Sequence, residues 1–125
     1  MDLNQVTVGS TDIDRSINFY TTLGLKLIVH THDKYARFEA PIGNGTFSLD
    51  WHEEVVPGTT KIYFEVADLD RVHSELKAQG IHFETGPTDQ SWLWKEARLK
   101  DPDGNTIILF QAGTHRKHPP WRKPN

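Results

Sequence analysis

The sequence predicts an α+β fold built from two pseudo-symmetric β-α-β-β-β modules. The main evidence is an internal repeat, because DIDRSINFYTTLGL at residues 12–25 returns without a gap as DLDRVHSELKAQGI at residues 68–81. A second pair, ARFEAPIGN at 36–44 and ARLKDPDGN at 97–105, repeats at a larger offset, which implies a few extra residues in the middle of the second copy, where a loop could lengthen. Such repeats are typical of a unit that buries its apolar face against a copy of itself.

The first copy reads as a strand, a helix and three further strands. Residues 3–8 alternate apolar and polar side chains, as a half-buried strand does. Asp12 is the expected N-cap of the helix, and Gly24 can end it in the left-handed conformation. Turn residues then separate three strand-like stretches, at residues 25–32, 35–39 and 46–51.

The second copy follows the same order. It has strand-like stretches at residues 61–66, 81–85, 95–100 and 106–111, with a helix at 68–79 that Gly80 ends. We therefore expect one domain over residues 1–113, with modules at about 3–51 and 61–111. Residues 114–125 are rich in proline and basic side chains, and they read as a C-terminal tail.

Composition limits the function classes. The chain of 125 residues has 14 Lys and Arg against 17 Asp and Glu, so no basic field indicates nucleic-acid binding. It has no cysteine, which excludes thiolate metal sites and a thiol nucleophile. No signal peptide and no apolar stretch of membrane-spanning length is evident. We expect a cytoplasmic protein that does not bind membranes.

Strand alternation predicts a candidate ligand face. If the apolar residues of each strand face the helices, the opposite side chains combine aromatic walls with a few polar groups, which is typical of a small-molecule cup. The predicted ligand-binding residues are Gln5, Arg37, Ser48, Asp50, Lys61, Tyr63, Glu65, Trp94, Arg98 and Ile108. The alternative is a filled roll in which charges such as Arg37 with Asp50, or Arg98 with Glu96, neutralise one another.

Three segments together resemble the vicinal oxygen chelate superfamily, which includes glyoxalase I, bleomycin-resistance proteins and extradiol dioxygenases. They are LNQVTVGSTDIDRSINFYTTLGL near the start, YFEVADLD before the second helix, and DPDGNTIILF near the end. The resemblance covers the chain to about Gly113. It implies that the two modules form an incomplete barrel around a metal, and that members commonly pair as homodimers.

The family's metal ligands come from the first and last strands of each module. By the resemblance these positions are Gln5, Ser48, Lys61 and Ile108. Ile108 has no donor atom. The ammonium group of Lys61 would repel a cation by about 4 kcal/mol per unit charge at a distance of 4 Å and an effective dielectric constant near 20. We therefore expect no metal and no other cofactor. No catalytic residue is assigned.

Other patterns leave alternatives open. His30 and His32 could chelate zinc from one strand, although no third ligand is evident nearby. Trp94 could be a wall of the cup or an aromatic of the core or dimer interface. The favoured function is metal-independent binding of a small organic ligand by a homodimer. The alternatives are a glyoxalase-like lyase or dioxygenase, metal-free proton transfer by Glu65, Tyr63 or Lys61, and a structural module with a filled cup.

Overall fold

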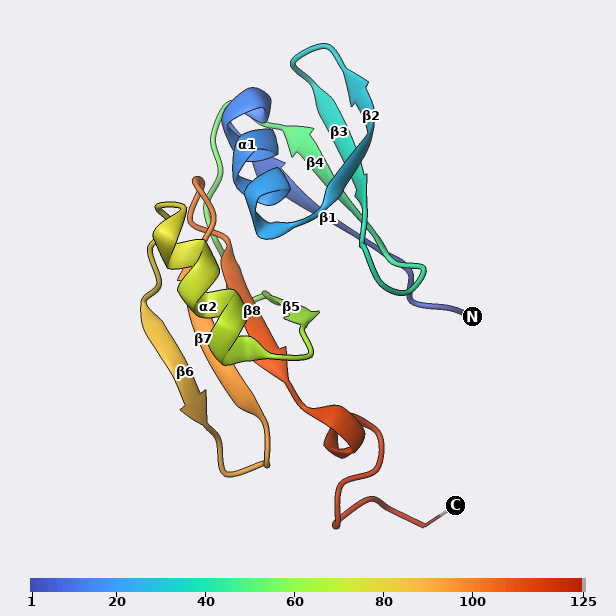
Figure 1. Cartoon of the computed structure of the whole chain (residues 1–125). Helices are drawn as coiled ribbons and strands as arrows, with labels where there is room; N and C mark the ends of the chain where they lie inside the picture. Colours follow the sequence, from blue (N-terminus) through green and yellow to red (C-terminus); the bar gives the residue numbers. More distant parts are fainter. Residues whose placement is uncertain (125) are drawn as a thin grey trace. The chain divides into compact units, whose positions relative to one another are not determined.

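The computed structural model describes residues 1–124, and it divides into two compact units (Figure 1). Unit 1 comprises Met1–Thr59 together with Asp101–Asn105. Unit 2 comprises Thr60–Lys100 and the described residues from Thr106 onward. Each unit contains four strands and one α-helix in the order β-α-β-β-β, which confirms the predicted α+β class and the two modules. The last residue of the predicted tail, Asn125, lies outside the described residues.

Unit 1 has one four-stranded sheet in the order β1-β4-β3-β2. Strands β1 and β4 are parallel, and the other neighbouring strands are antiparallel. The elements are β1 (Gln5–Ser10), α1 (Ile13–Leu23), β2 (Lys26–Thr31), β3 (Tyr35–Glu39) and β4 (Thr46–Trp51).

Unit 2 has the corresponding sheet order, β5-β8-β7-β6, with the same parallel and antiparallel pairs. Its elements are β5 (Lys61–Glu65), α2 (Leu69–Ala78), β6 (Thr85–Asp89), β7 (Lys95–Lys100), β8 (Thr106–Gln111) and the 3-10 helix η1 (Gly113–Arg116). Among residues 1–124, no helix combines the length and the apolar character that a membrane crossing requires.

The predicted helix ends are confirmed. The Oδ1 atom of Asp12 accepts a hydrogen bond from the backbone N–H of Arg15 at 3.1 Å. Asp68 does the same for Arg71 at 3.2 Å. Gly24 follows α1 with φ 110°, a conformation that glycine adopts without the steric cost of a Cβ atom. The repeated sequence therefore produces the same N-cap at the start of each helix.

The apolar side chains of alternate strand positions form the core of each unit, as predicted. In unit 1, the buried ring of Tyr20 on α1 packs 4.5 Å from Phe47 and 6.0 Å from Phe38, measured between ring centroids. In unit 2, Leu99 and Ile107 are fully buried on the corresponding strands. Burying side chains of this size contributes about 2 kcal/mol each through the hydrophobic effect.

Strand pairing explains the two repeat offsets. Val29 and Thr85 are equivalent, because each pairs with the arginine of the next strand, Arg37 or Arg98. Strand β6 has a bulge after Thr85. The hairpin that joins β6 to β7 is also longer than the turn at residues 32–34, which joins β2 to β3 in unit 1. The extra residues of the second copy therefore lie in the β6 bulge and the β6–β7 hairpin, so the expected longer loop is confirmed.

Three of the predicted strands had wrong boundaries. The first strand was expected at residues 3–8, whereas β1 runs from Gln5 to Ser10. Residues 81–84 are not a strand, since the N–H of Ile81 bonds to the carbonyl of Leu76 at the end of α2, and β6 begins at Thr85. Pro87 is tolerated inside β6 because β6 is an edge strand with a bulge at this point. In unit 1, β2 ends at Thr31, and His32 lies in the turn with a φ of 48°.

Candidate functional site

The sheet of unit 2 has one face towards α2 and a second face, which we call the outer face. On the outer face, strand pairing places side chains in three rows across β5, β8 and β7: Lys61, Thr106 and Lys100, then Tyr63, Ile108 and Arg98, then Glu65, Phe110 and Glu96. Trp94, which precedes β7, packs on Phe110 at the end of these rows. All six predicted site residues of the second module therefore share this face.

Aromatic rings gather at one end of the outer face. The Trp94 and Phe110 rings are stacked with centroids 4.7 Å apart, and Tyr63 meets both of them edge-on at 6.1 and 5.6 Å. Phe110 and Ile108 are 4% and 2% exposed, whereas Tyr63 remains 42% exposed. The cluster is thus a buried apolar floor with an accessible aromatic edge.

The phenol of Tyr63 is held in its protonated form. Burial raises the pKa of Tyr63, the Glu96 carboxylate raises it further, and the Arg98 guanidinium acts in the opposite direction. Because the ordinary pKa of a tyrosine is already near 10, the hydroxyl group stays neutral at pH 7. Tyr63 can therefore offer a hydrogen-bond donor beside the aromatic cluster.

The carboxylates of the outer face have partners within unit 2. The Oε2 atom of Glu96 accepts a hydrogen bond from the Trp92 indole at 3.1 Å. Arg98 pairs with Glu84 on the segment before β6 at 3.5 Å, so the alternative pairing of Arg98 with Glu96 is not formed. The partners of Glu96 and Arg98 therefore come from a neighbouring loop or segment and not from each other along β7.

The C-terminal segment contacts the same face through Glu65 and Trp94. Glu65 accepts a hydrogen bond from the backbone N–H of Ala112 at 3.3 Å and pairs with Arg116 at 3.4 Å. The Trp94 indole donates to the carbonyl of His115 at 3.4 Å. Ala112 is buried with Ile108 and Phe110, so the chain leaving β8 extends the apolar floor.

Unit 1 carries its four predicted site residues, Gln5, Arg37, Ser48 and Asp50, on the corresponding face of its own sheet. Ser48 is fully buried, and its hydroxyl lies 2.8 Å from the Tyr35 hydroxyl, which accepts from Arg37 Nε at 2.9 Å. Arg37 forms no ion pair with Asp50 within residues 1–124, so this proposed neutralising pair is also absent.

The four positions that the resemblance assigns to a metal offer few available donor atoms in this chain. Ile108 has no ligand atom, and Lys61 has only an ammonium group, which donates hydrogen bonds and repels cations. The Ser48 hydroxyl is engaged with Tyr35, and the Gln5 Oε1 atom accepts from Thr46 at 2.9 Å. Within residues 1–124, no group of three or more His, Cys, Asp and Glu side chains is placed to hold a metal ion.

The suggested histidine pair is not a chelating pair on one strand. His30 lies on β2, with its Nε2 atom 3.6 Å from an oxygen of Asp14. His32 lies beyond the end of β2 with a left-handed backbone, so strand alternation does not align its side chain with that of His30.

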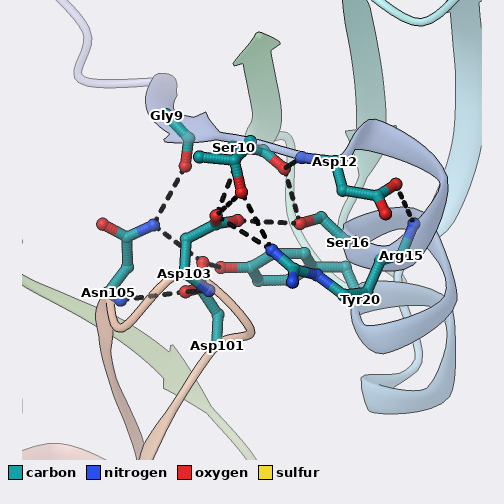
Figure 2. A network of polar contacts seen from close by, with 10 residues as sticks. Gly9, Ser10, Asp12, Arg15, Ser16, Tyr20, Asp101, Asp103 and Asn105 are labelled. Carbon is teal, nitrogen blue, oxygen red and sulfur yellow. Dashed lines mark hydrogen bonds and ion pairs between the residues drawn. The ribbon is translucent and has the colours of Figure 1, made fainter. Parts of the chain in front are cut away.

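Unit 1 also contains a buried polar network that the sequence analysis did not predict (Figure 2). Asp103 accepts hydrogen bonds from the backbone N–H and the hydroxyl of Thr11, at 3.0 and 2.6 Å, and from Ser16 at 3.2 Å. Arg15 completes the set with an ion pair to Asp103 at 3.0 Å. The carboxylate thereby satisfies polar groups next to the N-terminus of α1, where negative charge is favourable.

A second carboxylate of the same turn supports the network. The Tyr20 hydroxyl donates to Asp101 at 2.6 Å, and Asn105 donates both to Asp101 at 2.8 Å and to the carbonyl of Gly9 at 3.2 Å. Burial and the adjacent Asp101 carboxylate raise the pKa of Tyr20 far above its usual range. Aspartate, asparagine and glycine are ordinary turn residues, so the DPDGN segment carried no signal for this network in the sequence.

Comparisons with known proteins agree with this architecture. The family model of the Glyoxalase/Bleomycin resistance protein/Dioxygenase superfamily matches residues 2–109. A bleomycin resistance protein from Geobacillus stearothermophilus is 29% identical over 124 residues, covering 80% of this chain and 89% of the relative.

Solved structures show the same fold at lower sequence identity. A glyoxalase/bleomycin resistance protein/dioxygenase from Nocardioides aligns with a TM-score of 0.78 and 22% identity, covering 99% of this chain and 90% of that one. A lactoylglutathione lyase from Agrobacterium tumefaciens aligns with a TM-score of 0.75 and 16% identity, covering 88% and 92%. With its repeated β-α-β-β-β units and the match over residues 2–109, this chain belongs to the glyoxalase/bleomycin resistance protein/dioxygenase superfamily.

Proposed function

We propose that this protein binds a small organic ligand on the outer face of unit 2 and does so without a divalent metal. The observation that carries the proposal is the aromatic cluster of Tyr63, Trp94 and Phe110, which has an accessible edge and lies on one face with Arg98 and Lys61. A mixture of aromatic walls and a few polar groups is the usual composition of a ligand site.

Stacking on the aromatic cluster is the expected source of affinity. An aromatic ligand that covers the exposed parts of Tyr63 and Trp94 gains about 25 cal/mol for each Å² of apolar surface removed from water. A well-placed ring pair adds about 1 kcal/mol. The buried floor beneath, formed by Phe110 and Ile108, holds both rings in place before the ligand arrives, which lowers the entropic cost of binding.

The proposal omits the family metal because two of its four positions, Lys61 and Ile108, offer no suitable donor atom. Ile108 contributes only carbon, and a cation at this position would lie beside the positive charge of Lys61. Metal analysis of protein purified without chelator tests this point. We expect less than one tenth of an equivalent of zinc, nickel, manganese or iron, and a stoichiometric content of any of them would contradict the proposal.

The binding proposal is tested by ligand titration of the wild type and two tryptophan variants. The probes are bleomycin, after the name of several relatives, and 2-naphthoate as a small aromatic acid. We expect micromolar to millimolar binding by calorimetry that Trp94→Leu weakens at least tenfold. Trp51→Leu is the matched control, since Trp51 is exposed and lies on β4 of unit 1. Equal weakening by both substitutions, or no binding of either probe, would refute the proposed site.

We also infer that the protein is a cytoplasmic homodimer. Exposed apolar side chains support self-association, among them Ile28 on the edge strand β2, at 44% exposure, and Trp121, at 57%. The lack of cysteine suits a reducing compartment. Sedimentation equilibrium at micromolar concentration is expected to give twice the chain mass of 14.3 kDa, and a monomer would overturn this inference.

A further inference from the structure

We propose that Lys61, Lys100 and Thr106 form an anion subsite on the outer face of unit 2, so that the ligand is an elongated aromatic acid. This inference rests on the proposed function, because it names the chemical class of the ligand for the same face. Lys100 and Thr106 were not among the residues predicted from the sequence.

Strand pairing sets the geometry of the subsite. Thr106 on β8 pairs with Lys61 on β5 and with Lys100 on β7, so the two lysines flank the threonine in one row. Neighbouring strands are about 4.8 Å apart, which places the two lysine Cα atoms about 10 Å from each other. Flexible four-carbon side chains can close this span around one anionic group. Lys100 Nζ already lies 2.7 Å from the Thr106 hydroxyl oxygen.

Thr106 can complete the coordination of an anion. Its hydroxyl oxygen accepts the hydrogen bond from Lys100, so its own proton is available for donation to a ligand oxygen. Thr106 is 5% exposed, and a polar group shielded from water interacts more strongly with a charge. Two lysines and one threonine thus share a single row, with one lysine already bonded to the hydroxyl.

The charges of the outer face leave this row without compensation. Glu65 is occupied by Arg116 and the Ala112 N–H, Glu96 binds the Trp92 indole, and Arg98 pairs with Glu84. Within residues 1–124, neither Lys61 nor Lys100 forms an ion pair with a carboxylate. A ligand anion would therefore meet two uncompensated positive charges at this end of the face.

The spacing of the rows predicts the length of the ligand. Thr106 and Phe110 lie on one strand, four residues apart, and a strand advances about 3.3 Å per residue, so their rows are about 13 Å apart. A ring stacked at Trp94 therefore needs an extended linker to bring its acidic group to the lysine row. A compact aromatic acid can occupy only one of the two ends at a time.

The test compares matched probes by calorimetry: 6-phenylhexanoate, its uncharged amide, 6-phenylhexyl phosphate and the short phenylacetate. We expect the long acid to bind at least tenfold more tightly than its amide and than phenylacetate, with an affinity that falls as salt is added. Lys61→Gln and Lys100→Gln should each remove most of this preference for the acid and leave amide binding unchanged. Lys123→Gln, which removes the same charge from the exposed tail, should change neither.

The outcomes separate the subsite from the proposed function. If the long acid and its amide bind equally and Trp94→Leu weakens both, the anion subsite is refuted and the aromatic site remains. If no probe binds, the proposed function fails, and the subsite fails with it. Binding of phenylacetate as tight as that of 6-phenylhexanoate would refute the two-ended ligand. Preference for the phosphate over the carboxylate would support the subsite and identify phosphate as its anion.

Discussion

Asp103 and Thr11 are joined by two hydrogen bonds to the same carboxylate oxygen, one from the Thr11 backbone N–H at 3.0 Å and one from its hydroxyl at 2.6 Å. The two residues are 92 positions apart in the sequence. The side chain of Asp103 is 2% exposed, so these bonds are made away from water. The Asp101–Asn105 turn therefore contributes a buried anion that unit 1 requires.

Replacement of Asp103 by alanine should destabilise the protein by about 2 to 4 kcal/mol, because the Thr11 and Ser16 donors lose their acceptor. Urea unfolding at pH 7 measures the change. Asp12→Ala is a comparison in which one exposed N-cap bond is lost, with an expected cost of about 1 kcal/mol. Equal effects of the two substitutions would mean that the network contributes little.

The same carboxylate predicts an acid dependence of stability. Burial opposes ionisation of Asp103, but the hydrogen bonds from Thr11 and Ser10 and the charge of Arg15 together outweigh it, so the pKa of Asp103 is lowered. A lowered pKa in the folded state stabilises the protein above the unfolded-state pKa, about 3.9, and this contribution is lost as the pH falls through the lower folded-state pKa. The free energy of unfolding should therefore fall below about pH 4, and the fall should be smaller in Asp103→Asn. An identical pH profile for the variant would contradict this assignment.

Tyr20→Phe should cost about 1 to 3 kcal/mol, although the ring and its packing are kept. The substitution removes the hydroxyl that donates to Asp101 at 2.6 Å in a fully buried position. The measurement is thermal unfolding of Tyr20→Phe and of the comparison variant Tyr35→Phe. In the wild type, the Tyr35 hydroxyl lies in a partly buried site. The larger loss is expected at Tyr20.

Gly104→Ala should be more destabilising than Gly43→Ala. Both glycines have a positive φ, 89° and 81°, so alanine costs about 1 kcal/mol of backbone strain at either site. At Gly104 an added Cβ would also lie 2.9 Å from Cγ of Pro57, whereas it would meet no atom within 4 Å at Gly43. Chemical denaturation should resolve the difference in the free energy of unfolding. Equal losses of stability in the two variants would show that Pro57 can move aside without an energetic cost.

Arg116→Gln should loosen η1 without unfolding unit 2. The substitution removes the ion pair with Glu65, which also accepts the Ala112 N–H. Hydrogen exchange followed by NMR should show several-fold faster exchange at Ala112 and His115, with the β8 amides unchanged. Lys117→Gln is the control because it removes the neighbouring charge without breaking an ion pair within residues 1–124. Unchanged exchange in Arg116→Gln would exclude this anchoring role.

Much of the candidate site could be predicted, because strand alternation depends only on local geometry. Lys61, Tyr63 and Arg98 were predicted to share one face of the second module, and strand pairing places them there. The partner of Arg98 could not be predicted, since Glu84 lies in a segment that was expected to be a strand and is irregular in the structure. Lys100 and Thr106 follow the same alternation but were missed because they stand at the strand ends, next to the turn.

The sequence by itself determined the duplicated β-α-β-β-β order, the Asp12 cap of the first helix and the apolar face of each sheet, because repeats, capping and alternation are local properties. Only the tertiary structure decided where the DPDGN turn belongs. Read locally it is a hairpin turn between β7 and β8, but in the folded chain its Asp101, Asp103 and Asn105 side chains complete the polar network of unit 1. Such contacts between residues distant in the chain depend on packing, which no local pattern encodes.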